Sequence, residues 1–267
     1  MHDYILSEQM DEIERLKSQS DIWSEETRAF WKQAKIKVGM KGVDMGCGPG
    51  FACVELAEIV GESGSMTAFD GSENYLAYLK SQIKERQIKN IEVKRGDILE
   101  TNLPDNHFDF IFTRMVLIYI PRLEKALEEF KRILKPKGML LISDFYDYDQ
   151  FNLNVDAPLF KKLVNLITRD FAERKADVKV GKRITRLLRE SDFNVENMQA
   201  ASKIAYSDDV AWQWPEGFFK IYIPDLLQRN KISSEQVDAF WREWKKLVSD
   251  KSVCFLGPAL LQIIARK

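Results

Sequence analysis

Short apolar segments alternate with helical segments between residues 41 and 145, and this alternation restricts the fold more than any other feature of the chain. Strands joined by helices of about 10–15 residues are typical of βαβ units, whose right-handed connections place helices on both faces of a parallel sheet. The sequence therefore predicts an open α/β sheet. The expected strands are KGVDMG (41–46), SMTAFDG (65–71), IEVKRGD (91–97), HFDFIFT (107–113) and MLLISDF (139–145), with helices at 51–60, 72–87 and 121–134.

Helical patterns also flank this region on both sides. Residues 5–36 have apolar side chains at helical spacing, and Ser24 and Thr27 are candidate caps for a break in the middle. We expect three parts: a helical segment at 1–40, a core at 41–150, and helical insertions with the last two strands of the same sheet at 151–267. In that third part the predicted elements are helices at 156–174 and 182–191, a strand at 193–206, aromatic-rich helices within 208–250 and a final strand within 252–267.

The composition argues against several classes of partner. Of 267 residues, 40 are Lys or Arg and 41 are Asp or Glu, so the formal net charge is -1 and no broad basic field favours a nucleic acid or an anionic membrane. A small basic patch from Lys179, Lys182, Arg183 and Arg186 stays open as an RNA-binding alternative. The chain has no 18-residue apolar run, no signal-peptide pattern, and only three cysteines, too few and too scattered for a disulfide framework or a zinc site. These features predict a soluble, cytoplasmic protein.

The segment Val43-Asp44-Met45-Gly46-Cys47-Gly48-Pro49-Gly50 is the main candidate for a ligand site. Ligands of open α/β sheets bind outside the carboxyl ends of the strands, where glycines allow close approach to the backbone. A dinucleotide-binding turn would read GxGxxG, whereas the glycines here follow GxGxG and Phe51 occupies the third glycine position. Asp44 would repel a pyrophosphate and suits a cationic ligand, or it is a buried acid satisfied by the N–H groups of the turn.

Together with four further segments, this turn resembles the class I S-adenosylmethionine-dependent methyltransferases, in the branch of ubiquinone and menaquinone biosynthesis. The resemblance covers most of residues 41–145. It rests on VDMGCGPG, on Asp70 at the end of the second strand, and on RGDIL (95–99), FDFIFTRMVLIYIP (108–121) and LKPKG (134–138). It implies a Rossmann-like seven-stranded sheet in the order 3-2-1-4-5-7-6, with a helical N-terminal segment and a helical cap insertion. It also implies S-adenosyl-L-methionine as cofactor and S-adenosyl-L-homocysteine as product. The second lysine of LKPKG, Lys137, stands where the family commonly has glycine.

The resemblance also implies roles for single residues. Asp70 would hold the ribose hydroxyls and Asp97 the adenine amino group, although either could instead cap a helix or a turn. Ile98 would lie against the adenine ring, and Cys47 would contribute its backbone. The helical segment at 1–40 would act as a lid over the cofactor. The predicted cofactor-binding residues are Asp44, Gly46, Cys47, Gly48, Asp70, Gly71, Asp97, Ile98, Thr113, Tyr4 and Gln19, and Arg15 is a further candidate from the lid.

Methyl transfer from a sulfonium needs proximity and alignment, with optional removal of a proton from the acceptor. The two histidines, His2 and His107, are poorly placed for that proton transfer, so Tyr119 and Asp144 are the candidate catalytic residues. Other polar groups at the same strand ends are Thr113, Arg114, Tyr146 and Asp147. Asp144, Asp147 and Asp149 could gather a hard cation, but they lack a further Asn or Asp to complete the set, so we expect no metal.

Eight aromatic residues of the cap insertion give the remaining clue to the acceptor. Most should form the cap's own core, and a minority should line a pocket for a small apolar or aromatic acceptor. The eight are Trp212, Trp214, Phe218, Phe219, Tyr222, Phe240, Trp241 and Trp244.

The predicted function is methyl transfer to such an acceptor. We expect no nucleic acid or membrane partner, and a monomer or homodimer. The alternatives are a protein that binds the cofactor without methyl transfer, as a regulatory subunit or a cyclase does, and an NAD-dependent oxidoreductase.

Overall fold

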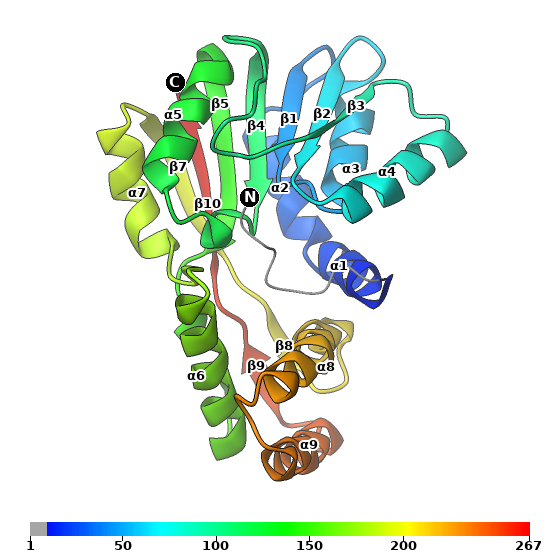
Figure 1. The fold of residues 1–267 in the computed structure, drawn as a ribbon, viewed down its shortest axis with the longest axis vertical. Helices are drawn as coiled ribbons and strands as arrows, with labels where there is room; N and C mark the ends of the chain where they lie inside the picture. Colours follow the sequence, from blue (N-terminus) through cyan, green and yellow to red (C-terminus); the bar gives the residue numbers. More distant parts are fainter. Residues whose placement is uncertain (1–9) are drawn as a thin grey trace.

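The computed structural model describes residues 10–267, which form one large sheet, a small second sheet and the helices packed on them (Figure 1). The large sheet has seven strands in the order β3-β2-β1-β4-β5-β10-β7, and only β10 runs antiparallel to its neighbours. Because β7 and β10 are its sixth and seventh strands along the chain, the predicted fold class and strand order are confirmed. The strands are β1 (Lys41–Met45), β2 (Ser65–Asp70), β3 (Ile91–Arg95), β4 (Phe108–Arg114), β5 (Leu134–Phe145), β7 (Asn194–Ala201) and β10 (Leu260–Arg266).

Helices cover both faces of this sheet, as βαβ connections require. α2 (Ser24–Gln33), α3 (Phe51–Val60) and α4 (Glu73–Glu85) bury side chains on one face, where Trp31 meets Phe112 edge to face with ring centroids 5.4 Å apart. α5 (Leu123–Ile133) and α7 (Gly181–Glu190) bury theirs on the other face. None of the helices within residues 10–267 is long and apolar enough to span a bilayer.

The cap lies below the sheet in Figure 1 and contains a second, three-stranded sheet. The predicted single strand at 193–206 is wrong, because the chain leaves β7 at Ala201 and enters β8 in the second sheet. The predicted last strand is divided in the same way, into β9 and β10, near Gly257. The Gly257 N–H donates to the Lys203 carbonyl at 2.8 Å, so it joins this break to the break between β7 and β8. The cap elements are β6 (Asn152–Leu153), β8 (Ile204–Tyr206), β9 (Cys254–Leu256), α6 (Pro158–Glu173), α8 (Gln213–Gln228) and α9 (Ser234–Ser249).

The N-terminal helices differ from the prediction at their junction. α1 (Met10–Ile22) and α2 are separated at Trp23, as expected, but neither Ser24 nor Thr27 caps the break. The Thr27 hydroxyl instead donates to the Trp23 carbonyl at 2.7 Å, within the first turn of α2. β5 also begins five residues earlier than expected, because Leu134 already pairs with Phe108 of β4.

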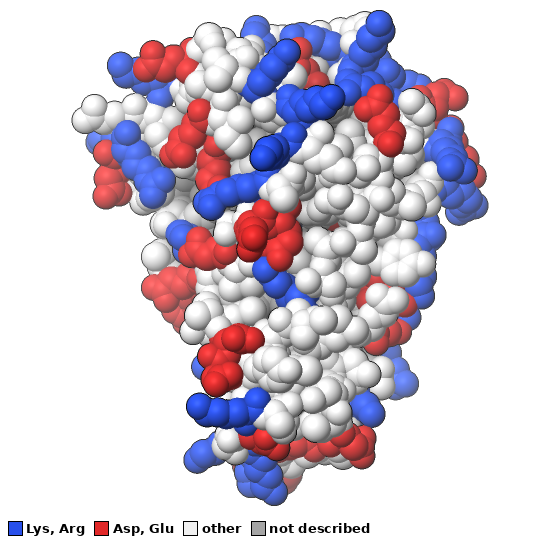
Figure 2. Space-filling model, turned by 180° about the vertical axis from the view of Figure 1, so that it is seen from behind, with Lys and Arg blue, Asp and Glu red and all other residues white. Residues whose placement is uncertain are grey.

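Basic and acidic side chains are interspersed on the face shown in Figure 2. The candidate basic patch around α7 is similarly compensated. Lys179 pairs with Asp149, Lys182 with Asp147, Arg183 with Asp177 at 2.8 Å, and Arg186 with Glu190 at 3.8 Å. Each cation of this patch therefore has an acidic partner, which leaves little excess positive charge for an RNA backbone.

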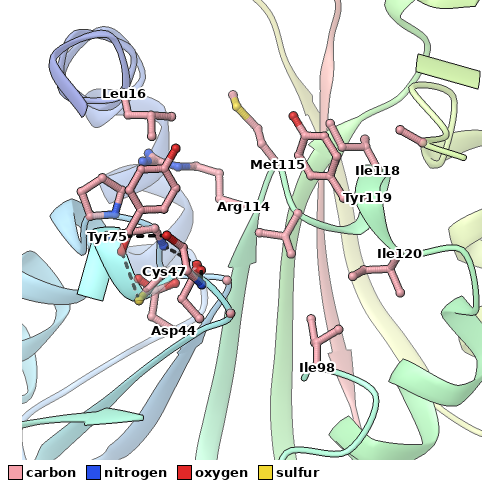
Figure 3. Close-up of a pocket in the computed structure, with 18 of the residues that line it drawn as sticks. Leu16, Asp44, Cys47, Tyr75, Ile98, Arg114, Met115, Ile118, Tyr119 and Ile120 are labelled. Atoms are coloured by element: carbon pink, nitrogen blue, oxygen red, sulfur yellow. Dashed lines mark hydrogen bonds between the residues drawn. The ribbon is translucent and has the colours of Figure 1, made fainter. Parts of the chain in front are cut away.

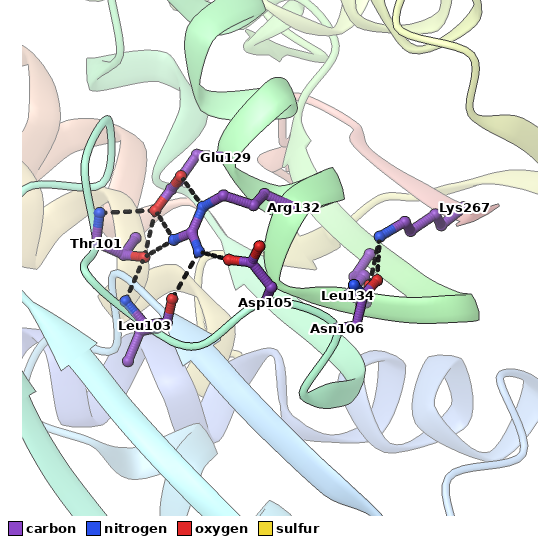
Figure 4. A network of polar contacts seen from close by, with 8 residues as sticks. All are labelled: Thr101, Leu103, Asp105, Asn106, Glu129, Arg132, Leu134 and Lys267. Carbon is purple, nitrogen blue, oxygen red and sulfur yellow. Dashed lines mark hydrogen bonds and ion pairs between the residues drawn. The ribbon is translucent and has the colours of Figure 1, made fainter.

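An ion-pair network ties the loop before β4 to α5 (Figure 4). The Arg132 guanidinium donates to both carboxylate oxygens of Glu129 at 2.7 and 2.8 Å and also pairs with Asp105. Glu129 in turn accepts from the Thr101 hydroxyl at 2.5 Å and from the Thr101 N–H at 2.8 Å. The hydrogen bonds from Arg132, followed by those from Thr101, outweigh the opposing effect of burial and lower the pKa of Glu129 to about 2.

This network predicts a stability loss in acid. A carboxyl group whose pKa is lower in the folded state stabilises the fold above its unfolded pKa, and that stabilisation is lost as the pH falls toward the folded pKa. Glu129 should contribute on the order of 3 kcal/mol at pH 7, declining from about pH 5 to pH 2. Urea unfolding of wild type and Glu129→Gln should therefore differ clearly at pH 7 and converge near pH 2.5. Glu128→Gln, on the exposed side of α5, is the matched control, and a Glu129→Gln difference that does not change with pH would contradict the assignment.

Candidate functional site

The loop between β1 and α3 takes a backbone path that requires glycine. Gly46, Gly48 and Gly50 all have positive φ, at 75°, 53° and 85°. A Cβ on Gly46 would lie 2.5 Å from a Val116 methyl group, and one on Gly50 would lie 2.4 Å from a Leu79 methyl group. A Cβ on Gly48 would meet nothing within 4 Å, because Gly48 faces an open cavity. The loop is therefore packed closely from behind and open toward the cavity at its centre.

Asp70, at the end of β2, lies beside this loop and lines the same cavity. One carboxylate oxygen accepts a hydrogen bond from the Gly48 N–H at 2.8 Å, and the other accepts one from the Ser72 N–H at 2.8 Å. Asp70 is not the cap of α4, because the Ser72 hydroxyl fills that role by accepting from the Tyr75 N–H at 3.2 Å. Asp70 thus presents a carboxylate whose position is fixed by two backbone groups.

Asp44 is the most deeply buried acid of the cavity, with 3% of its surface exposed. Its Oδ2 atom has no hydrogen-bond partner among the described residues. Burial raises the pKa of Asp44 to about 7, and the neighbouring Arg114 only partly opposes this effect. An unpaired buried carboxylate oxygen is costly, so its position at a cavity wall favours a cationic or hydrogen-bond-donating ligand there.

Figure 3 shows the two walls of the cavity between the strand ends. Asp44, Cys47 and Tyr75 gather on one side, and Met115 and Tyr119 lie on the other. The Arg114 side chain points toward the N-terminal helices, where its guanidinium donates to the hydroxyls of Ser20 on α1 and Thr27 on α2 at 3.0 Å each. Arg114 therefore joins the floor of the cavity to both N-terminal helices.

Most of the other predicted cofactor residues also line the cavity. Gly71, Asp97 and Ile98 follow β2 and β3, and one Asp97 carboxylate oxygen accepts from the Leu99 N–H at 2.9 Å, so Asp97 also caps its own turn. Gln19 of α1 lines the cavity too, and its side-chain oxygen accepts from the Trp214 indole at 3.1 Å. Thr113 is fully buried and does not line the cavity. Tyr4 lies outside the described residues.

The two candidate catalytic residues occupy different environments. Tyr119 lines the cavity and packs against Phe171 with ring centroids 6.2 Å apart. Asp144 does not line it. Its carboxylate is 2% exposed and accepts hydrogen bonds from the N–H groups of Val116, Leu117 and Phe145 at 2.7–3.0 Å. Burial raises the pKa of Asp144 to about 7 although these hydrogen bonds oppose it, and the carboxylate holds the backbone that leads to Tyr119.

The remaining polar candidates at these strand ends lie off the cavity. Tyr146 is partly exposed, and Asp147 forms an ion pair with Lys182 of α7. Asp149 pairs with Lys179, so both acids are engaged with cations. Within residues 10–267, no three His, Cys, Asp or Glu side chains are grouped so as to hold a metal ion.

The far end of the cavity is aromatic, and the sequence predicts only part of it. Of the eight aromatic cap residues, Trp214 and Phe218 line the cavity, and the other six pack within the cap. Phe145, Tyr148 and Phe171 also line it and were not predicted. The sequence positions of two of them could have indicated this role, since Phe145 is the last residue of β5 and Tyr148 follows three residues later. We call this end the aromatic lobe, defined by Phe145, Tyr148, Ile167, Phe171, Trp214 and Phe218.

A family described as a methyltransferase domain matches residues 36–205. The demethylmenaquinone methyltransferase of Geobacillus sp. (strain WCH70) is 31% identical over 153 residues, which are 53% of this chain and 62% of that enzyme. The chain thus spans less than two thirds of this relative.

Solved structures share the fold. A SAM-dependent methyltransferase from Aquifex aeolicus is 26% identical, with a TM-score of 0.51 over 64% of this chain and 81% of that one. The cyclase SpnF is 16% identical, with a TM-score of 0.56 over 90% of this chain and 79% of that one, which shows a common fold alone. The glycine loop, the sheet order and the matched residues agree, and the chain belongs to the methyltransferase domain family, in its class I S-adenosylmethionine-dependent group.

Proposed function

We propose that the chain is an S-adenosylmethionine-dependent methyltransferase whose acceptor is a small apolar or aromatic molecule. One observation carries this proposal: a single cavity of about 830 Å³ joins the acidic glycine loop to the aromatic lobe. Sites for small molecules typically have volumes of about 300–1,000 Å³. A cavity near the upper end of that range, polar at one end and aromatic at the other, suits a cofactor and an acceptor bound side by side.

The residues at the acidic end fit the cofactor. The Asp70 carboxylate stands at a strand end where it could hold ribose hydroxyls, and Ile98 offers an apolar contact for adenine beside Asp97. The unpaired oxygen of Asp44 suits the positive charge of the methionine part, and Gly48 leaves room for close approach to the backbone. Gly46, Cys47, Gly71 and Gln19 complete the proposed cofactor contacts.

When bound there, S-adenosylmethionine supplies a methyl group activated by its sulfonium, and the work left to the protein is alignment and exclusion of water. The aromatic lobe provides a dry surface for the acceptor. We propose that Tyr119 contacts the acceptor, because its ring packs against Phe171 of the aromatic lobe and lies across the cavity from Asp44 and Cys47 (Figure 3). Asp144 then acts as a positioning residue, which fixes the backbone of Val116 and Leu117.

The relatives support an apolar acceptor. The Geobacillus enzyme is named for demethylmenaquinone, an apolar aromatic acceptor, and the aromatic lobe here has the matching chemical character. This chain also shares its fold with the cyclase SpnF. Cofactor binding without methyl transfer is therefore the alternative that the experiment must test.

The experiment is calorimetric titration with S-adenosylhomocysteine and, in parallel, with NADH. We expect micromolar binding of S-adenosylhomocysteine alone, since Asp44 and the GxGxG spacing disfavour a pyrophosphate. A screen of aromatic hydroxyl and amine compounds with S-adenosylmethionine should then yield a methylated product. Binding without transfer to any acceptor would favour the non-transferring alternative, and binding of NADH alone would overturn the proposal.

A further inference from the structure

Arg114, the last residue of β4, is a cation of the cavity wall that the proposed cofactor contacts leave without a role. Its guanidinium donates to the hydroxyls of Ser20 and Thr27, which are neutral, and it forms no ion pair with a carboxylate of residues 10–267. Burial lowers the pKa of Arg114, and the nearby Asp44 carboxyl opposes this effect. A guanidinium removed from water without an anion beside it is costly, so this wall favours an anionic group of a ligand.

The other cations of the described cavity wall are less suited to bind an anion at this end. Lys175 is exposed and follows α6, the helix that carries Phe171 of the aromatic lobe. The remaining three already have a carboxylate partner, and these ion pairs are Arg15 with Glu12 at 2.7 Å, Arg95 with Glu73 at 2.6 Å and Arg174 with Asp225 at 3.3 Å. Arg114 is therefore the cation whose charge is left for a ligand beside the glycine loop.

Asp44 places the opposite charge on the neighbouring strand. It pairs in register with Phe112 of β4, and Arg114 follows two residues later, so the two charged side chains leave the sheet on the same face. The Oδ2 atom of Asp44 has no hydrogen-bond partner among the described residues, so Asp44 and Arg114 are near each other without being paired. An acid and a base arranged in this way match a ligand that carries both an ammonium group and a carboxylate.

The methionine part of S-adenosylmethionine is such a group, because one carbon atom carries both its ammonium and its carboxylate. A guanidinium has several N–H donors in one plane, and its planar fork matches the geometry of a carboxylate. Ser20 and Thr27 each accept one of the hydrogen bonds of Arg114, which leaves further N–H groups for a ligand. Figure 3 shows the Arg114 side chain extending from β4 toward the side of the cavity that holds Asp44 and Tyr75.

We propose that Arg114 binds the carboxylate of the methionine part of the cofactor, while Asp44 faces its ammonium group and the hydroxyls of Ser20 and Thr27 hold the guanidinium in place. The inference rests on the cofactor site of the proposed function. It also links that site to the N-terminal helices, because Ser20 belongs to α1 and Thr27 to α2. Arg114 thus selects a ligand with a complete amino acid part and joins it to both helices.

The test compares S-adenosylhomocysteine with its decarboxylated form, which keeps the ammonium group and lacks only the carboxylate. Each ligand is titrated calorimetrically into the wild type and into Arg114→Met. We expect the wild type to prefer S-adenosylhomocysteine by about 30-fold, because charge-assisted hydrogen bonds contribute roughly that factor. Arg114→Met should remove this preference: its affinity for S-adenosylhomocysteine should fall by about 30-fold, and its affinity for the decarboxylated form should stay unchanged.

Two further variants serve as controls. The double variant Glu12→Gln with Arg15→Gln removes the other cation of α1 together with its own acid, so the site loses no net charge and the preference should persist. Arg28→Met, on α2, removes an exposed ion pair with Glu55 outside the cavity and should bind both ligands as the wild type does. Thermal unfolding of each variant shows whether it is folded.

An equal loss of affinity for both ligands in Arg114→Met would mean a structural role only and would overturn the inference. A wild type without preference would also overturn it, as would a preference lost in the double variant and kept in Arg114→Met. If Arg114→Met does not fold, Ser20→Ala decides: it removes one hydroxyl that holds the guanidinium and should reduce the preference by about 5-fold, and an unchanged preference would refute the inference. Failure of the proposed function has a different signature, since the wild type would bind neither ligand and the inference would fall with it.

Discussion

Replacement of Asp70 with alanine should weaken the binding of S-adenosylhomocysteine by about 100-fold. A carboxylate that holds two vicinal hydroxyls forms charge-assisted hydrogen bonds, each contributing about 1.5–3 kcal/mol. The carboxylate is already oriented by the N–H groups of Gly48 and Ser72, so little conformational entropy is lost when a ligand binds. Calorimetric titration of the wild type and the variant measures the change directly.

The two backbone contacts of Asp70 require a control for folding. Asp70→Asn keeps a side chain of the same size but only one acceptor oxygen, so it should keep one of the two backbone hydrogen bonds while it loses the charge. Glu92→Gln, on the exposed surface of neighbouring β3, should bind as the wild type does. Thermal unfolding of all variants shows whether the loop is intact, and an unchanged affinity in Asp70→Asn and Asp70→Ala would remove Asp70 from the proposed cofactor site.

Replacement of Arg229 with methionine should lower the free energy of unfolding by about 3 kcal/mol at pH 7. Arg229 follows α8 and donates to both carboxylate oxygens of Asp170 at 2.6 and 2.7 Å, while Asp225 accepts from Arg229 at 2.6 Å. The Asp170 side chain is 1% exposed, so the substitution leaves a buried carboxylate without its cation. Burial alone would raise the pKa of Asp170, but the hydrogen bonds from Arg229 and Tyr222 outweigh it and lower that pKa.

The pH dependence distinguishes this explanation from a simple loss of packing. Without Arg229, burial should raise the pKa of Asp170, so the destabilisation should shrink as the pH falls and the carboxyl group takes up a proton. The double variant Asp170→Asn with Arg229→Met should recover part of the loss at pH 7. Lys220→Met removes an exposed ion pair with Glu216 on the same helix and should change stability by less than about 1 kcal/mol. A loss of similar size in Lys220→Met and Arg229→Met in urea unfolding would contradict this account.

The sequence by itself determined the sheet and the acidic end of the cavity. Asp44 and Asp70 lie at the carboxyl ends of β1 and β2, Asp97 follows β3, and the carboxyl ends of parallel strands meet at one edge of the sheet. Local order along the chain therefore brings these three residues to the same cavity. The glycine pattern also constrained the ligand class, because GxGxG lacks the third glycine of a dinucleotide-binding turn.

Tertiary packing alone decided the acceptor end. Asp144 and Tyr148 lie four residues apart near the end of β5, yet Asp144 turns inward to three backbone N–H groups and Tyr148 faces the cavity. Trp214 and Phe218 reach the cavity because the cap folds over the sheet, whereas Phe219 and Trp244 of the same aromatic segment pack against each other. The direction of each of these side chains depends on contacts between residues far apart in the chain, and periodicity in the sequence does not encode those contacts.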